Sequence, residues 1–494
     1  MAAMAAKRVL AFDFGASSGR AILAEYTGGK IQMRELHRFN NDPVKLGDVF
    51  YWDIVRLMFE IKQGILKAVH EGGFDAIGID TWGVDFGLLD GNGRLLGNPV
   101  HYRDERTAGM MEQVFGRIPK EELYERTGTQ LMRLNTIFQL AYLSMHDRDT
   151  LKRADIMLMI PDLMAYFLTG EKRAEYTEAS TSQCLDPVTG DWAYDLMRRI
   201  DIPDSIFPTI IDAGEQYGML SDEICAELGC PKVPVIAVCT HDTGSAVAAV
   251  PTQEKDFIYI SCGTWSLFGT ELPASVINEV TQKYNFTNEG GYGRTARLLK
   301  NIMGLWLIQE SRRQWMREGA EVSYADLERE ALVAKPMKFF VDPDYSDFYT
   351  PGDLPGRIVA FCERTGQGTP STRGEIMRCI YESLAMKYRH VFVQTREITG
   401  KDYTAIHMIG GGTKDRLLCS MAANACNCTV AAGPIEATAM GNIAVQFISL
   451  GELSGLSEAR KVIAASEDLK NYAPDADEVV KWDAAYGRFK TILA

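Results

Sequence analysis

The stretch VLAFDFGASSGRAILAEY, residues 9–26, places two apolar runs on either side of a short turn rich in glycine and serine. Asp13 stands just before the turn, and Gly15 and Gly19 lie within it. Such turns leave backbone N–H groups free to point at an anion. The dinucleotide fingerprint G-x-G-x-x-G and the P-loop G-x-x-x-x-G-K-[ST] both open a helix, whereas Arg20 is followed by the strand-like run AILAEY. The stretch therefore predicts a β-hairpin with an acid at its first corner.

The residues around this hairpin continue the pattern of an antiparallel meander. Alternating apolar and polar positions predict strands at 8–13, 20–26 and 31–37. Apolar side chains at helical spacing then predict a helix over 52–71, and the apolar run DAIGID at 75–80 predicts a buried strand. The chain is thus expected to open with three strands, a helix and a fourth strand.

A second hairpin is expected halfway along the chain. FIYISCGTWSLFGTEL, residues 257–272, again sets two apolar runs around a turn of small residues, and its Gly263 lies 248 positions after Gly15 in a chain of 494. Internal repetition of this kind determines the architecture before any single motif does. The repeat predicts two related domains, which we place at 1–248 and 249–494.

A third glycine turn has a different shape. In HMIGGGTKDRLL a strand is expected to end at residue 409, followed by Gly410–Gly412 and a helix. Such a turn lets the backbone approach a flat ligand or a phosphate. Before it, residues 373–400 are expected to form a long helix, with Thr372 and Glu375 at the spacing of a capping box.

Composition excludes several classes of protein. The chain has 66 acidic residues against 52 basic ones, a net charge of −14, which argues against a nucleic-acid partner and against an anionic membrane surface. Its ten cysteines include no CxxC pair, so reduced thiols in a cytoplasm are expected. No run of about 18 apolar residues occurs, and the N-terminal segment lacks the pattern of a secretory signal. These features predict a soluble cytoplasmic protein of ordinary globular type.

Two aspartates at expected strand ends each allow two interpretations. Asp13 alone is typical of an Asx-turn, and alternatively it holds the water shell of Mg²⁺ beside a nucleotide. In VPVIAVCTHDTGSAVAAV an apolar strand is expected to end at Cys239, and Asp242 alone is typical of a helix N-cap. A carboxylate at the carboxyl end of a strand is also where an α/β protein places a catalytic base. For His241 the sequence favours a hydrogen-bonded core histidine.

Two further segments carry acids. GIDTWGVDFGLLD holds Asp80, Trp82, Gly83 and Asp85; two strands joined by a turn of solvated acids is one interpretation, and a sugar pocket of aromatic ring and carboxylates is the other. YRDERT, residues 102–107, is expected to be a solvated loop. No HExxH, Cys/His metal spacing or G-x-S-x-G elbow occurs, which excludes the zinc and serine hydrolase motifs. The remaining features together suggest phosphoryl transfer to a hydroxylated substrate.

The ordered motifs also carry a family resemblance. They are DFGASSGR, GIDTWGVDFGLLD, YRDERT, PDLMAYFLTG, THDTGSAV, SCGTWSLFG, TNEGG, LKNIMGLWLIQ, IGGG and GPIEATAMGNIAVQ, and they extend over nearly the whole chain. This set resembles the FGGY carbohydrate kinases, and within them the branch that acts on L-rhamnulose. The resemblance implies an α/β actin-like ATPase fold with two ribonuclease-H-like domains around a central nucleotide cleft, the N-terminal domain binding sugar and phosphates and the C-terminal domain binding nucleotide.

The resemblance also implies roles for individual residues. Asp242 matches the family's proton acceptor, and Asp13 would face Mg²⁺ through water. ATP would be held by Ala16, Ser17, Ser18, Gly19, Arg20, Thr264, Gln309, Gly410, Gly411 and Gly412. The sugar would be met by Gly83, His241, Asp242, Thr243 and Asn301. The implied reaction is ATP-dependent phosphorylation of L-rhamnulose at its 1-hydroxyl, in L-rhamnose breakdown.

Two rival functions stay open at this point. One is a kinase for another deoxyketose such as L-fuculose, which a panel of ketoses would distinguish. The other is a non-catalytic actin-like protein, a filament former or a nucleotide-dependent sugar sensor. The presence of Asp242 favours an enzyme, because a sensor needs no base.

Overall fold

The structure is a computed structural model that describes residues 6–493. The chain divides into two compact units that interleave along the sequence. Unit 1 comprises Met1–Gln253, Glu271–Leu298 and Ala437–Glu467, and unit 2 comprises Glu254–Thr270, Leu299–Glu436 and Asp468–Ala494. The predicted pair of related domains at 1–248 and 249–494, with the roles assigned to each, stays a prediction.

Unit 1 is built on a six-stranded sheet of order β13-β14-β6-β1-β2-β3. The predicted meander is confirmed, because β1 (Arg8–Phe14), β2 (Ser18–Thr27) and β3 (Lys30–Asn40) pair antiparallel in sequence. The predicted buried strand is β6 (Ala76–Thr81), which pairs parallel with β1 on one side and with β14 (Pro234–Ile236) on the other. The antiparallel β13 (Gln216–Met219) completes the sheet at its edge.

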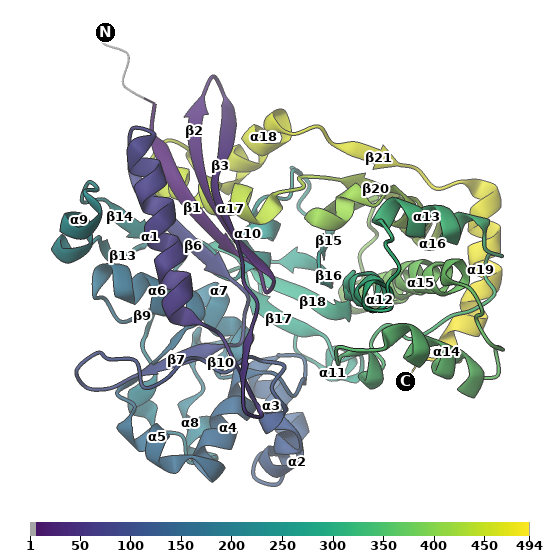
Figure 1. Cartoon of the computed structure of the whole chain (residues 1–494), viewed down its shortest axis with the longest axis horizontal. Coiled ribbons are helices and arrows are strands. Elements are labelled where there is room, and N and C mark those ends of the chain that lie inside the picture. The colour runs from purple at the N-terminus through teal and green to yellow at the C-terminus, as the bar shows by residue number, and fades with distance from the viewer. Residues whose placement is uncertain (1–5, 494) are drawn as a thin grey trace. The chain divides into compact units, whose positions relative to one another are not determined.

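Helices cover both faces of this sheet (Figure 1). The predicted helix 52–71 is α1 (Ile54–His70), which starts where the Asp53 carboxylate accepts the Arg56 N–H. A Cβ added to Gly64 of α1 would lie 2.6 Å from the Phe12 ring, and one added to Gly78 of β6 would lie 2.5 Å from Asn442 of α17 (Ala437–Ser449). Register pairs Phe12 with Ile79, next to Gly78, and alternate residues face opposite sides. α1 and α17 therefore lie on opposite faces.

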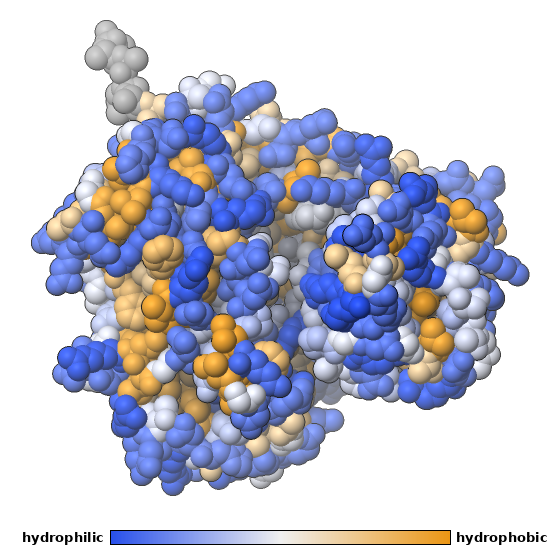
Figure 2. Space-filling view, viewed as in Figure 1, coloured by the Kyte–Doolittle hydropathy of each residue, from blue (hydrophilic) through white to orange (hydrophobic). Residues whose placement is uncertain are grey.

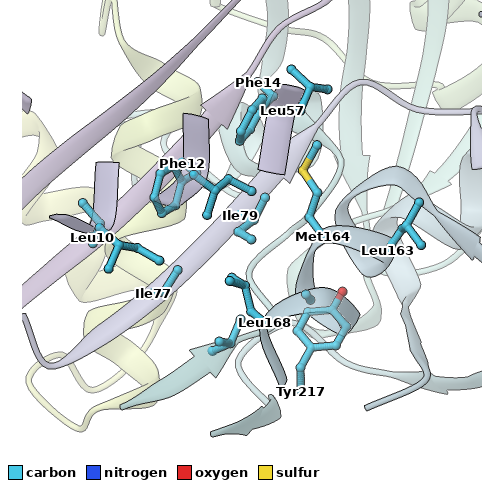
Figure 3. Packing of buried hydrophobic residues seen from close by; sticks show 14 of the residues in the cluster. Leu10, Phe12, Phe14, Leu57, Ile77, Ile79, Leu163, Met164, Leu168 and Tyr217 are labelled. Atoms are coloured by element: carbon cyan, nitrogen blue, oxygen red, sulfur yellow. The ribbon is translucent and has the colours of Figure 1, made fainter. Parts of the chain in front are cut away.

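The main core of unit 1 lies between this sheet and two helices. Side chains of Leu10, Phe12 and Phe14 from β1 and of Ile77 and Ile79 from β6 gather on one face. Figure 3 shows them with Leu57 of α1, Tyr217 of β13, and Leu163, Met164 and Leu168 of α6 (Ile160–Thr169). Burying one such side chain contributes about 1.5–3 kcal/mol, so this face fixes how β1 and β6 sit beside α1 and α6.

The remaining elements of unit 1 surround this core. The predicted strand up to Cys239 is wrong in length, because β14 ends at Ile236 and the next residue instead exchanges hydrogen bonds with Gly214 and Glu215. The other strands and helices of unit 1 are β4 (Val44–Leu46), β5 (Val49–Tyr51), β7 (Phe86–Leu89), α2 (Met110–Phe115), α3 (Lys120–Thr127), α4 (Thr136–His146), α5 (Arg148–Arg153), β8 (Ile156–Met159), β9 (Arg173–Glu175), α7 (Tyr176–Ala179), β10 (Leu185–Asp186), β11 (Asp191–Trp192), α8 (Tyr194–Arg199), β12 (Thr209–Ile211), α9 (Asp222–Leu228), α10 (Asp242–Ala248), α11 (Glu279–Lys283), β17 (Thr287–Gly290) and α18 (Leu456–Ser466).

Unit 2 repeats the strand order of unit 1. The predicted second hairpin is confirmed as β15 (Ile258–Cys262) antiparallel to β16 (Trp265–Leu272). β15 also pairs parallel with β19 (Ala405–Ile409), which pairs parallel with β20 (Thr429–Ala432), and β21 (Lys470–Tyr472) closes this edge antiparallel. The order β18-β16-β15-β19-β20-β21 thus corresponds to β3-β2-β1-β6-β14-β13, with β18 at Ala296–Met303.

The long predicted helix of unit 2 is α15 (Arg373–Thr399). Its predicted capping box is half right: the Thr372 hydroxyl accepts the Glu375 N–H at 3.1 Å, but the Glu375 carboxylate binds the N–H and hydroxyl of Ser371. The strand, glycine turn and helix predicted around residue 410 are β19, a 3-10 turn η6 (Gly411–Lys414) and α16 (Arg416–Cys426). The other helices are α12 (Trp306–Arg317), α13 (Tyr324–Val333), α14 (Leu354–Arg364) and α19 (Ala476–Lys490).

The surface shown in Figure 2 is hydrophilic over most of its area, with separate small apolar patches. Within residues 6–493, no helix combines the length and the apolar composition needed to span a bilayer.

Candidate functional site

Three carboxyl groups meet where neighbouring strands of unit 1 end. Asp13 on β1 is the register partner of Asp80 on β6, and the next residue of β6, Thr81, donates its N–H to Thr240 O at 2.8 Å and bridges to His241. Asp242 follows directly. Because the carboxyl ends of parallel strands meet at one edge of a sheet, β1, β6 and the segment after β14 bring Asp13, Asp80 and Asp242 to the same edge.

Asp80 is the buried member of this trio. Its pKa lies well above the usual value, first because burial disfavours the charged form and then because Asp13 and Asp242 are nearby acids. The amide of Asn442 on α17 donates to Asp80 Oδ2 at 2.5 Å and acts in the opposite direction. The surroundings thus favour the protonated form of Asp80.

Hydrogen bonds and close packing fix the shape of the turn after Asp13. The Gly15 N–H donates to Ser18 O at 2.9 Å, and Asn41 braces the turn through bonds to Gly15 O and Ser17 O. A Cβ on Gly19 would lie 2.3 Å from the Phe39 ring, so only glycine fits there. Ser17 at the tip is exposed, which leaves the turn accessible. The Arg20 guanidinium donates to Asp13 Oδ2, which places this cation beside the acid.

Asp242 is not a helix N-cap, so that interpretation is wrong. Helix α10 begins at Asp242, its N-cap is His241, and no side chain caps it. The side chain of Asp242 is 31% exposed and accepts a hydrogen bond from the Thr243 hydroxyl at 3.1 Å. An acid that is accessible and free of a capping role is suited to accept a proton from a bound ligand.

His241 agrees with the interpretation of a hydrogen-bonded, buried histidine. Its ring nitrogen Nδ1 lies 3.0 Å from Nη2 of Arg297, and the carboxylate of Glu289 is 3.4 Å from the same nitrogen. The other nitrogen, Nε2, lies 3.5 Å from Asp242 Oδ1. The imidazole is therefore placed between a buried ion pair and the accessible acid.

The turn that carries Gly83 is strained and tightly held. Val84 has φ of 69°, a left-handed conformation that β-branched residues avoid and that costs on the order of 1–3 kcal/mol. Its N–H donates to Thr181 Oγ1 at 3.0 Å and its carbonyl accepts the Thr136 hydroxyl at 2.7 Å. A Cβ on Gly83 would lie 2.9 Å from Thr181. This turn is thus fixed in shape by its neighbours.

Asp85 is buried, so the interpretation of this segment as solvated acids is wrong. Its carboxylate accepts hydrogen bonds from the indole N–H groups of Trp52 at 2.6 Å and Trp82 at 3.1 Å, from the Tyr102 N–H and from the Gln139 amide. The two indoles pack with centroids 4.0 Å apart. Burial raises the pKa of Asp85 to about 6, although these donors oppose the shift. Asp85 therefore organises the wall beside Gly83 and is too enclosed to contact a ligand.

The segment 102–107 is not a solvated loop either. Asp104 is buried and accepts the Phe50 N–H and the Arg106 N–H, each at 2.9 Å, and Thr107 is also buried. Arg106 donates to the Gln139 amide oxygen at 2.8 Å. Asp104 is thus used internally, because it satisfies backbone N–H groups that burial would otherwise leave unpaired.

In unit 2 the residues implied for the nucleotide lie around the end of β15. Thr264 O accepts the N–H groups of Gly304 at 3.1 Å and Trp306 at 3.2 Å, so the second hairpin turn contacts the start of α12, which carries Gln309. A Cβ on Gly412 would lie 2.2 Å from Cys262 Sγ, which brings the third glycine turn against β15. Asn301 lies on β18 and is half-buried.

Several residues of the site were missed from the sequence. Asn442 binds Asp80, and Gln446, one turn later, donates to Asn442 at 2.7 Å and to Leu10 O at 3.3 Å. The available signal was a pair of amide side chains at i and i+4 in a helix whose other residues are mostly apolar. Glu289 and Arg297 carried no signal of their own, because only the fold brings their strands to His241.

Comparison with known proteins covers both halves of the chain. The model for the N-terminal domain of the FGGY family of carbohydrate kinases matches residues 8–249, and the model for the C-terminal domain matches residues 258–450. A rhamnulokinase of Bacteroides thetaiotaomicron is 42% identical over 98% of this chain and 99% of its own length. A rhamnulokinase of Oceanobacillus iheyensis is 43% identical over 94% of this chain and 98% of its own.

Solved structures agree on the fold. A gluconate kinase from Lactobacillus acidophilus has a TM-score of 0.83 at 16% identity, over 99% of this chain and 98% of its own. A xylulose kinase from the same bacterium has a TM-score of 0.81 at 16% identity, over 98% and 97%.

Proposed function

The chain belongs to the FGGY family of carbohydrate kinases, and we propose that it transfers the γ-phosphoryl group of ATP to the 1-hydroxyl of L-rhamnulose. The two family models confirm the family that the motifs indicated, and with the solved structures they confirm the two-domain actin-like α/β fold. The substrate follows from relatives that are about 42% identical over nearly the full length and carry that activity in their names.

The observation that supports catalysis most directly is the position of Asp242. It stands at the carboxyl edge of the sheet, 31% exposed, with no capping role. In the proposed reaction the 1-hydroxyl oxygen attacks the γ-phosphorus as the bond to the ADP oxygen breaks, and Asp242 takes the hydroxyl proton. A carboxylate is a weak base towards an alcohol, so the proton moves late, once bond formation has acidified the hydroxyl.

The first hairpin is proposed to hold the phosphates. Ala16 and Ser17 lie in the tight turn, with Ser17 exposed, and Ser18, Gly19 and Arg20 begin β2 directly after it. Such a turn is suited to present N–H groups to an anion. A chain with a net charge of −14 needs local compensation for a triphosphate, and Arg20 supplies one cation there. On this proposal Arg20 divides its donors between Asp13 and a phosphate oxygen.

Mg²⁺ is proposed to lie beside Asp13. No group of three or more His, Cys, Asp or Glu side chains among residues 6–493 forms a protein cage for a metal. One carboxylate at a strand end next to a phosphate-binding turn does fit Mg²⁺, which keeps several waters and takes its other ligands from substrate phosphates. When bound, the ion neutralises charge on the triphosphate.

Other residues are proposed to position the two substrates. Thr264, Gln309 and Gly410–Gly412 lie around the end of β15 and would contact the nucleotide. Gly83, His241, Thr243 and Asn301 would contact the sugar. The strained turn at Val84 supports this role for Gly83, since such strain is retained where geometry matters. Use of ATP also leads us to expect the cytoplasm as the compartment.

The test is a coupled ADP-release assay across ketoses. We expect the highest kcat/KM with L-rhamnulose and a lower value with L-fuculose, a deoxyketose that differs in stereochemistry alone. Preference for L-fuculose would move the assignment to the rival kinase. Sugar and nucleotide binding without sugar-stimulated ADP release would favour the non-catalytic sensor, and the variant Asp242→Asn provides the background rate for that comparison.

A further inference from the structure

The imidazole of His241 is held by a buried arginine that approaches it from the side opposite Asp242. Arg297 lies on β18, is fully buried, and donates from Nε to Gly290 O at 2.7 Å. Its Nη2 lies 3.0 Å from His241 Nδ1 and 3.2 Å from the carboxylate of Glu289. The guanidinium is thus fixed by the end of β17 and aimed at one nitrogen of the ring.

The chemistry of these groups decides where the imidazole carries its proton. A guanidinium has only N–H donors and no acceptor, and it stays charged in proteins. Arg297 Nη2 is closer to Nδ1, at 3.0 Å, than Glu289 Oε2 is, at 3.4 Å, which favours Nδ1 as an acceptor and a neutral imidazole with its proton on Nε2. Glu289 balances the arginine charge, which lets the pair remain buried beside the ring.

We propose that Arg297 is a positioning residue that fixes the tautomer of His241, so that the ring presents Nε2–H as a hydrogen-bond donor beside the Asp242 carboxylate. Nε2 lies 3.5 Å from Asp242 Oδ1, so a donor and an acceptor stand side by side at the site. A substrate hydroxyl fits such a pair, because its oxygen accepts from His241 while its proton faces Asp242. The part of this inference that concerns the sugar rests on the proposed function, whereas the tautomer does not.

The tautomer is measured on the protein alone, with neither sugar nor nucleotide. Histidine labelled with ¹⁵N in the ring gives ring-nitrogen and ring-proton correlations by NMR, and His241→Asn identifies the signal of His241 among the seven histidines. We expect a bare Nδ1 and a protonated Nε2. A proton on Nδ1, alone or together with Nε2, overturns the proposal. This measurement uses the wild-type arginine, so it decides the matter even if variants at 297 do not fold.

Kinetics then test whether the arginine acts through the histidine. We expect Arg297→Met to raise the KM for the sugar about threefold to tenfold, the equivalent of roughly one hydrogen bond. Arg297→Lys restores part of the loss because it keeps one donor. In a His241→Ala background, Arg297→Met should change KM less than about twofold, because its target is gone. Equal fold-changes in both backgrounds would show a general structural role and overturn the proposal.

A matched control is Arg460→Met in the same unit. Arg460 is also buried and pairs with Glu271 at 2.8 Å, but it lies on α18. We expect it to lower the melting temperature without changing the KM for sugar. If no sugar is turned over by the wild-type protein, the proposed function fails while the ring tautomer still decides the present inference.

Discussion

Asp13 and Asp80 are register partners on neighbouring parallel strands, so their side chains project from the same face of the sheet. Their partners differ: Asp13 accepts from the guanidinium of Arg20, and Asp80 accepts from the amide of Asn442. Burial and the neighbouring acids raise the pKa of Asp80. Two identical side chains at paired positions thus have different hydrogen-bond partners, and we propose different roles for them.

The first prediction compares these two aspartates. Asp13→Asn should sharply weaken Mg²⁺-dependent turnover, because the carboxylate that faces the ion is lost. Asp80→Asn should leave turnover within about tenfold of wild type, since an amide oxygen can replace the acceptor that Asn442 binds. The measurement is turnover as a function of Mg²⁺ concentration for both variants. Full activity of Asp13→Asn at low Mg²⁺ would contradict the metal role.

The second prediction concerns the base. Asp242→Asn should lower turnover about 10²–10⁴-fold, the usual contribution of a general base, because the amide cannot take the proton. Since Asp242 makes no capping bond, the melting temperature should change little. The control is Asp222→Asn, which alters an acid at the first position of α9, another helix of seven residues, and should leave turnover unchanged. Near-normal turnover of Asp242→Asn would return the catalytic role to another acid.

The third prediction is a pH dependence of stability. Asp85 has a pKa of about 6 in the folded protein against 3.8 for the ordinary side chain. Between these values the folded protein holds a proton that the unfolded chain has released, so this group's contribution is complete below about pH 4 and is lost as pH rises through about 6. The loss amounts to about 3 kcal/mol.

Urea denaturation of the wild type and of Asp85→Asn across pH 4–7 measures this contribution. We expect the difference in unfolding free energy between the two proteins to shrink as pH rises, because the amide does not titrate and the other groups are shared. The control is Asp90→Asn, just past the other end of β7. A difference that stays constant with pH for Asp85→Asn would show that Asp85 is already ionised at pH 4.

The fourth prediction concerns the packing behind the base. A Cβ on Gly441 of α17 would lie 1.8 Å from Ser245 O on α10, the helix that begins at Asp242. Gly441→Ala should therefore destabilise unit 1 by about 1–3 kcal/mol and reduce turnover, because α10 must shift. Gly487→Ala is the control: this glycine is also inside a helix, α19, but has open space around it, so alanine should be neutral or stabilising by up to about 1 kcal/mol. Equal effects of the two substitutions on stability would contradict the packing argument.

Local sequence pattern was enough for much of the fold. The hairpin turns at Gly15 and Gly263, the helix after Asp53 and the strand at 76–81 all follow from alternation and periodicity within a few residues. The length of β14 did not follow, because its apolar run continues to Cys239 while its regular pairing with β6 ends at Ile236. Strand length there depends on neighbours distant in sequence.

The candidate site was predictable to a smaller extent. Asp13 and Asp242 were found because they stand at expected strand ends. Asp85 was misjudged, because an acid in an apolar run gives no local sign that the indoles of Trp52 and Trp82 will donate to it. The same holds for Arg297, whose partner His241 is 56 residues away in sequence. Burial of a charged group is a property of the assembled fold and leaves little trace in its neighbours along the chain.

The place of α17 in the sequence has a consequence for how unit 1 is made in the cell. β6 ends at Thr81, but α17, which covers its second face and supplies Asn442, begins only at Ala437. At about 5–20 residues per second, synthesis takes on the order of 20–70 s to join the two. Throughout that interval the nascent chain has β1 and β6 without the helix that covers Gly78 and binds Asp80. The sheet edge that carries Asp13, Asp80 and Asp242 is therefore complete only when nearly the whole polypeptide has been synthesised. An unfinished chain lacks a finished site.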